Sequence, residues 1–130
     1  MTKRSRAILW LSAALLVAVV PTYAHHSFAA GYFEDQIQRV EGDVAVLLFR
    51  NPHSWVHMDV KNEKGVVERY SIEWGSGVQL TQQGVTRNSL KVGDRVIVVG
   101  NPGRKASEHR MRMRQIERPA DGWKWGGTFD

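Results

Sequence analysis

His25 and His26 follow a segment that has the features of a cleavable export signal. Cleavage after Ala24 would make His25 the first residue of the mature chain, so that one residue carries both a free α-amine and an imidazole. The amine has a pKa near ~8 and the imidazole near ~6.5, so the pair is partly deprotonated at neutral pH and can chelate a transition metal. Copper(II) favours nitrogen ligands in a planar arrangement, and one more imidazole would complete a three-nitrogen set. The pattern favours copper as a cofactor, with no cofactor as the alternative.

Three other histidines are candidates for the additional metal ligand: His26, His53 and His57. On one regular strand, His53 and His57 would be separated by four rises of ~3.3 Å, about 13 Å, which is too far to share one ion. At most one of them is therefore expected to join His25. We prefer His53, because it follows a proline-induced break near the start of a strand, and we take His57 as the second choice. A catalytic zinc site is disfavoured, because no glutamate lies at a short spacing from two histidines.

Each of these histidines also has an ordinary structural interpretation. His25 and His26 can be terminal residues that only happen to follow the cut. His53 can bond a backbone carbonyl in the Asn-Pro turn, and His57 can face solvent from its strand. His109, in a polar loop, has no supporting pattern.

The export signal has three parts in the expected order. A positive start over residues 1–6 precedes an uncharged apolar run over residues 7–20, and the small residues Thr22 and Ala24 precede the cut. The apolar run of 14 residues is shorter than the ~20 needed to cross a bilayer. We therefore expect no stable membrane span after signal removal, and a periplasmic or secreted protein.

Composition excludes several function classes. Cleavage would leave 106 of the 130 residues, enough for one domain, and would lower the formal charge from +5 to +2, so the basic full chain is no evidence for nucleic-acid binding. The absence of cysteine excludes disulfides, thiolate catalysis and cysteine-based zinc sites. The chain offers no recognisable nucleophile context and no glycine-rich phosphate loop, so enzymatic function stays undecided and a non-enzymatic role is favoured.

Short apolar alternations separated by Gly, Pro and Asn predict a mainly β protein. Gly42 falls on the inward side of the first predicted strand, which suggests a bulge or a sharp bend there. Ser76 is expected to cap a short helix, Leu80 to point from it into the open end of the barrel, and Gly84 to end it. The elements expected in chain order are strands at about 37–49, 54–61 and 66–74, a helix over 78–83, a turn and strand within 90–100, and a strand at about 110–117.

Three strands, a short helix and two more strands match the order of the five-stranded OB barrel. An immunoglobulin-like sandwich is the alternative, but it needs about seven strands. The tail after the barrel shows no clear periodicity, although Trp123 and Trp125 in it can fold back onto the barrel. The expected organisation is a signal peptide over 1–24, an N-terminal arm over 25–36, an OB-like barrel over 37–118 and a C-terminal tail over 119–130.

A second function is suggested by basic side chains. Arg110, Arg112 and Arg114 alternate along the fifth predicted strand, and Trp55 lies in the second, where OB barrels often stack their ligands. These four residues are candidates for binding an anionic ligand or an acidic protein partner without a metal. Alternating arginines are also typical of a solvated face that protects a strand edge from aggregation. Nucleic acid is not an expected partner, because an exported protein meets little of it.

The assembled motifs resemble an uncharacterised family of small exported bacterial proteins. The motifs are His25-His26-Ser27-Phe28, Asn51-Pro52-His53-Ser54-Trp55 and Gly93-Asp94-Arg95-Val96. The resemblance covers nearly all of the mature chain and implies an exported OB-like module, without an established activity. From the residues themselves we predict a small exported binding module with a divalent-metal site centred on His25, and a metal-free interaction module is the alternative.

Overall fold

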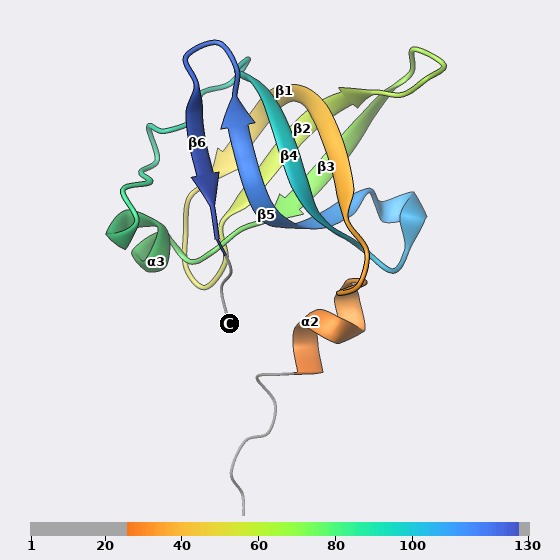
Figure 1. Cartoon of the computed structure of the whole chain (residues 1–130), viewed down its shortest axis with the longest axis horizontal. Coiled ribbons are helices and arrows are strands. Elements are labelled where there is room, and N and C mark those ends of the chain that lie inside the picture. The colour runs from red at the N-terminus through yellow and green to blue at the C-terminus, as the bar shows by residue number, and fades with distance from the viewer. Residues whose placement is uncertain (1–25, 128–130) are drawn as a thin grey trace, which may run out of the picture.

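The computed structural model describes residues 26–127, which form one β-barrel with short helices beside it (Figure 1). The predicted signal peptide, residues 1–24, lies outside the described residues, and so do His25 and residues 128–130. No helix within residues 26–127 is long and apolar enough to cross a membrane. The elements in chain order are α2 (His26–Gly31), β1 (Gln38–Leu48), β2 (Trp55–Lys61), β3 (Val67–Glu73), α3 (Gly77–Gln82), β4 (Arg95–Pro102), the 3-10 turn η1 (Ala106–Glu108), β5 (Arg110–Arg118) and β6 (Trp123–Gly126).

The strands are ordered β3-β2-β1-β4-β5-β6, and a parallel pairing between β3 and β5 closes the first five into a barrel. The other neighbouring pairs are antiparallel. This is the arrangement of an OB barrel, and it confirms the fold class and the chain order expected from the sequence. The parallel register sets Ser71 opposite Arg110 and Glu73 opposite Arg112, so the end of β3 lies beside the start of β5.

Gly42 marks the point where β1 changes its partner. β1 pairs with β4 over residues 38–43 and with β2 over residues 43–48. A Cβ built on Gly42 would lie 2.2 Å from the carbonyl oxygen of Asp59, so the approach of β1 to β2 leaves no room for a side chain. The register shift itself falls beyond the glycine, between Val44 and Val46. The irregularity predicted at Gly42 is therefore present. At Gly42 itself it is the close approach of β1 to β2, and the bulge lies further along β1, between Val44 and Val46.

Side chains that alternate inward from the strands fill the barrel. In β5 the period of two is plain, since Met111 and Met113 are buried while Arg110 is exposed and Arg112 half-buried. The core also takes in Trp74, which follows β3 directly. The buried apolar set is Val40, Val44, Val56, Met58, Val60, Ile72, Trp74, Leu80, Val85, Leu90, Val96, Val98, Met111, Met113, Ile116 and Trp125.

α3 begins and ends one residue earlier than predicted, and its cap is the predicted one. The Ser76 hydroxyl accepts the backbone N–H of Gln79, and the Gln79 side chain accepts the backbone N–H of Ser76 at 3.2 Å. Asn51 Oδ1 accepts the backbone N–H of Val78 at 3.2 Å, which ties the β1–β2 loop to the start of the helix. Leu80 is fully buried in the barrel core, as its position in the pattern predicted.

β6 is an addition to the predicted strands. It pairs antiparallel with the end of β5, with Trp125 opposite Ile116. The buried Trp125 ring packs edge-on against Trp74 at 5.2 Å between centroids, and its Nε1 donates to Gln83 Oε1 at 2.7 Å. The tail therefore folds back through its tryptophans as expected, but as an ordered strand that is too short to show an alternation in the sequence.

Candidate functional site

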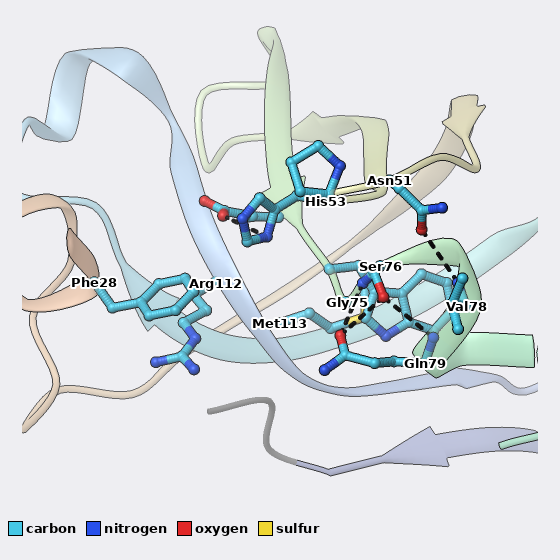
Figure 2. Close-up of a pocket in the computed structure, with 12 residues that line it drawn as sticks. Phe28, Asn51, His53, Gly75, Ser76, Val78, Gln79, Arg112 and Met113 are labelled. Atoms are coloured by element: carbon cyan, nitrogen blue, oxygen red, sulfur yellow. Dashed lines mark hydrogen bonds and ion pairs between the residues drawn. The ribbon is translucent and has the colours of Figure 1, made fainter. Parts of the chain in front are cut away.

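A cleft of about 470 Å³ opens at one end of the barrel (Figure 2). Its walls come from five places in the chain: α2, the β1–β2 loop, the end of β3, the start of α3 and β5. The parallel pairing of β3 with β5 brings two of these segments together, and the Asn51 bond to α3 brings two more. The residues that line it are Phe28, Asn51, Pro52, His53, Glu73, Trp74, Gly75, Ser76, Val78, Gln79, Arg112 and Met113.

Glu73, the last residue of β3, carries a buried carboxylate at the centre of this region. The Tyr32 hydroxyl donates to Glu73 Oε2, and Arg110 Nη2 lies 3.7 Å from the same oxygen and 3.3 Å from the Tyr32 hydroxyl. On the other side, His53 Nδ1 lies 3.3 Å from Glu73 Oε1. Three groups thus surround one carboxylate, which offsets the cost of burying its charge.

Tyr32 connects the N-terminal arm to this carboxylate. Its backbone N–H donates to Phe28 O at 2.8 Å, and it forms an isolated β-bridge with Gly103. The side chain is 3% exposed. Burial, followed by the hydrogen bond to Glu73, raises the pKa of the Tyr32 phenol above its usual value. The phenol therefore stays protonated and acts as a donor throughout the neutral range.

His53 is held by the loop that follows β1. The next residue, Ser54, is fixed on both sides, because its N–H donates to Gly75 O at 2.9 Å and its carbonyl accepts the N–H of Trp74 at 2.8 Å. The His53 ring then turns Nδ1 toward Glu73, and Nε2 has no hydrogen-bond partner among residues 28–127. Sequence reasoning allowed a bond from this ring to a backbone carbonyl of the Asn-Pro turn, but the observed partner is a carboxylate from another strand.

α2 lies at the mouth of the cleft. Phe28 packs edge-on against the His53 ring at 6.0 Å between centroids. The guanidinium carbon of Arg112 lies 3.7 Å from the centroid of the Phe28 ring. Arg104 Nε donates to Ala29 O at 2.6 Å and so anchors the same helix from the β4–β5 loop. Figure 2 shows Phe28 and Arg112 together at one end of the cleft. The helix begins at His26, which would be the second residue of the predicted mature chain.

His57 lies elsewhere on the sheet. It faces Ser71, with Nδ1 3.0 Å from Ser71 Oγ, whereas Trp55 is the β2 residue opposite Glu73. Burial, followed by the charges of Arg69 and Arg50, lowers the pKa of His57. Of the two histidines on this side of the barrel, the structure brings His53 to Glu73 and holds His57 at a separate contact.

His109 belongs to a third environment. Its ring packs against Tyr70 at 5.0 Å between centroids, and its Nδ1 lies 3.7 Å from Glu68 Oε2. Within residues 28–127, no three side chains among His, Asp and Glu are grouped closely enough to hold a metal ion by themselves. The side chains of His25 and His26 fall outside that part of the chain.

The predicted basic residues divide between two places. The Arg110 guanidinium lies 5.2 Å from the Trp55 ring centroid and 5.6 Å from that of Tyr32, so it joins the group around Glu73. Arg112 joins through Phe28, as described above. Arg114 Nε donates instead to Asn101 Oδ1 at 2.6 Å. Trp55, Arg110 and Arg112 therefore gather near the cleft. Arg114 instead contacts Asn101, whose side-chain amide donates to the Glu34 and Gln36 carbonyls of the N-terminal arm.

Sequence reasoning missed Glu73 and Tyr32. Glu73 lies between Ile72 and Trp74, so the alternation assigns it to an outward face with no special role. Tyr32 lies in an arm without periodicity. The one available signal was the predicted OB order itself, because it places the end of the third strand beside the start of the fifth.

Comparison with known proteins gives a family without an activity. No curated protein matches the sequence of this chain. One family model, described as "Family of unknown function (DUF6152)", matches residues 13–112. The matched range takes in all three motifs quoted above and most of the barrel. The chain therefore belongs to this family of unknown function.

Proposed function

We propose that the protein is an exported binding module that holds one divalent transition metal, copper(II), between His53 and the mature N-terminus. The observation that carries the proposal is the contact between His53 Nδ1 and Glu73 Oε1 at 3.3 Å. Histidines that ligate metals usually donate their other ring N–H to a carboxylate, which fixes the ring and its tautomer. The same arrangement would leave the Nε2 lone pair of His53 available to a metal.

The carboxylate is itself well held, and this supports its role as an orienting group. Tyr32 donates to Glu73 Oε2, and Arg110 lies 3.7 Å from that oxygen, so rotation of the carboxylate away from His53 would break contacts on its other side. Phe28 restricts the ring further by packing against it. His53 is therefore preorganised, which lowers the entropy lost when it binds an ion.

The remaining ligands in this proposal come from His25. His25 lies three positions before Phe28, so the two Cα atoms lie within about 11 Å of each other, since consecutive Cα atoms are ~3.8 Å apart. That span, together with the length of a side chain, is sufficient to bring the His25 amine and imidazole toward the ring against which Phe28 packs. His26 is the alternative donor from the same segment. Three nitrogens of this kind suit copper(II) better than zinc.

The first test is mass spectrometry of the protein isolated after export, under non-denaturing and then denaturing conditions. We expect a chain that begins at His25 and retains one copper ion. A different first residue, or a chain that begins at His25 and stays metal-free when copper is added, would contradict the proposal.

Copper titrations against a competing chelator then identify the ligands. Inserting one alanine before His25 and replacing His53 by alanine should each weaken copper binding by at least ~100-fold, and Glu73→Gln by about 10- to 100-fold, the usual range for an orienting carboxylate. His57→Ala is the matched control, because it removes an imidazole from the same strand region without touching Glu73. Equal affinities for the His53→Ala and His57→Ala variants would remove His53 from the site.

A further inference from the structure

A second cleft, of about 480 Å³, lies between the β1–β2 loop, α3 and the loop that follows α3. Arg50 belongs to the first of these segments and Arg87 to the last, and both residues line the cleft. Among residues 28–127, none that lines it is acidic. A cleft lined by one sign of charge raises the local concentration of ions of the opposite sign, so this wall favours an anion.

Arg50 and Arg87 differ from the other arginines because their side chains are unpaired. Both are exposed, and neither guanidinium group has a hydrogen bond, an ion pair or a ring contact within residues 28–127. Every other arginine in that part of the chain contacts a carboxylate, a carbonyl or amide oxygen, or an aromatic ring. The two unpaired guanidinium groups therefore belong to one cleft, whose wall holds no carboxylate to neutralise them.

The backbone holds both arginines in fixed positions. The Arg50 N–H donates to Ser54 Oγ at 3.1 Å, and the Arg50 carbonyl accepts the Gly77 N–H at 3.0 Å, which ties the β1–β2 loop to the start of α3. Arg87 lies in the turn over residues 86–89, whose ends are joined by a backbone hydrogen bond of 3.0 Å. Because the anchor points of the two side chains are ordered in advance, less entropy is lost when both engage one ligand.

The rest of the wall offers a further donor and an apolar surface. Asn51 Oδ1 accepts the Val78 N–H at 3.2 Å (Figure 2), and the Asn51 NH₂ group has no acceptor within residues 28–127. Phe49 is half-buried and Val78 is 56% exposed, and both line the cleft. A ligand with its anionic group at the arginines would therefore find an apolar surface for an attached organic group.

A phosphate monoester matches this arrangement. Its phosphoryl group carries about −1.5 to −2 charges at neutral pH and three strong acceptor oxygens, whereas a carboxylate carries one charge and two oxygens. Guanidinium groups bind phosphate oxygens through paired N–H donors, so two of them suit a dianion.

We propose that the second cleft binds a small soluble phosphate monoester. The phosphoryl group pairs with Arg50 and Arg87, and the organic group packs against Phe49 and Val78. The proposal does not rest on copper, because neither guanidinium group contacts His53 or Glu73. Failure of this site and failure of the metal site are therefore separate results.

The test uses phenyl phosphate and the full-length chain, treated with EDTA and then dialysed. Heteronuclear NMR follows the backbone amide signals of Arg50, Gly77 and Arg87, and we expect saturable shifts of these signals. Phenyl sulfate has the same ring but a single negative charge, and it should bind about three- to fivefold more weakly, the usual effect of one exposed ion pair. No saturable shift at these amides, or equal binding of phenyl sulfate, overturns the proposal.

Variants test the two assigned cations. Arg50→Gln and Arg87→Gln should each weaken binding of phenyl phosphate about three- to fivefold. Both variants should fold as the wild type does, because the side chains that they alter have no contacts within residues 28–127. Arg39→Gln is the control at the same net charge, since Arg39 is exposed on β1 and pairs with Glu41, and it should leave the affinity unchanged. Equal losses for all three variants would indicate a general effect of net charge and would overturn the site.

A last measurement separates a soluble ester from a lipid headgroup, since phosphatidic acid also carries a phosphate monoester. Vesicles of phosphatidic acid and phosphatidylcholine are sedimented with the wild-type chain and with Arg50→Gln. We expect no co-sedimentation that depends on Arg50. Co-sedimentation that Arg50→Gln abolishes, without a response of the wild-type chain to phenyl phosphate, would overturn the proposal of a soluble ligand.

Discussion

Replacing Tyr32 by phenylalanine removes a single oxygen atom from the centre of the candidate site. The Tyr32 hydroxyl donates to Glu73 Oε2 and lies 3.3 Å from Arg110 Nη2. The ring itself stays, so the packing of the arm against the barrel is kept. The substitution therefore isolates the contribution of one hydrogen bond to a buried carboxylate.

The structure sets the size of the expected loss. Tyr32 is 3% exposed and Glu73 9% exposed, so water has little access to replace the missing donor. A hydrogen bond to a charged group contributes ~1.5–3 kcal/mol to stability. We expect Tyr32→Phe to lower the free energy of unfolding by about 2 kcal/mol. At ~4–8 °C per kcal/mol for a domain of this size, the melting temperature falls by roughly 8–16 °C.

Urea unfolding followed by circular dichroism measures this loss, with Tyr70→Phe as the matched control. Among residues 28–127 the Tyr70 hydroxyl has only a weak contact, to Gln38 Nε2 at 3.5 Å, so its removal should cost less than ~0.5 kcal/mol. Equal losses for Tyr32→Phe and Tyr70→Phe would refute the reasoning, because the buried carboxylate would then not depend on the Tyr32 hydroxyl.

Two further predictions concern the barrel and its titration. Gly42→Ala should lower the free energy of unfolding by about 2–4 kcal/mol in urea titrations, because the new Cβ would lie 2.2 Å from Asp59 O. Gly31→Ala is the control and should cost far less, because its Cβ meets nothing within 4 Å. Similar losses for the two variants would exclude steric crowding as the cause. Burial and then the bond to Glu73 raise the pKa of Tyr32 above that of an unfolded tyrosine, so folding favours the protonated phenol. The contribution of this phenol to the free energy of unfolding is complete below pH ~10 and is lost as the pH rises further. Between neutral and alkaline pH, the free energy of unfolding should therefore fall less for Tyr32→Phe than for wild type. Identical pH dependences of the two proteins would contradict this assignment.

Local pattern was sufficient for the strands of the barrel. The alternation of Met111 and Met113 with arginines predicted which face of β5 is buried, because successive residues of a strand face opposite sides. The capping pattern at Ser76 located the start of α3 within one residue, because the cap depends only on neighbours along the chain. The irregularity at Gly42 was also readable, since an inward glycine in a strand signals close approach.

Segments without a long period were not predictable in the same way. β6 spans only Trp123–Gly126, and its place depends on Trp125 packing against Trp74, a residue about fifty positions away. The choice between His53 and His57 rested on strand spacing and a proline, which favoured His53 but named no partner for it. The tertiary structure distinguishes the two side chains, because His53 contacts Glu73 and His57 contacts Ser71.

The sequence by itself determined the five-stranded barrel, the chain order of its strands, the buried face of β5 and the histidine and arginine side chains suited to bind a metal or an anion. These properties follow from periodicity and residue chemistry, which are local. Only the tertiary structure decided that Glu73 lies between His53, Tyr32 and Arg110, and that the buried Trp74 indole N–H has no acceptor among residues 28–127. Such contacts join the arm, the β1–β2 loop, β3 and β5, and their geometry is set by how the barrel closes rather than by any segment alone.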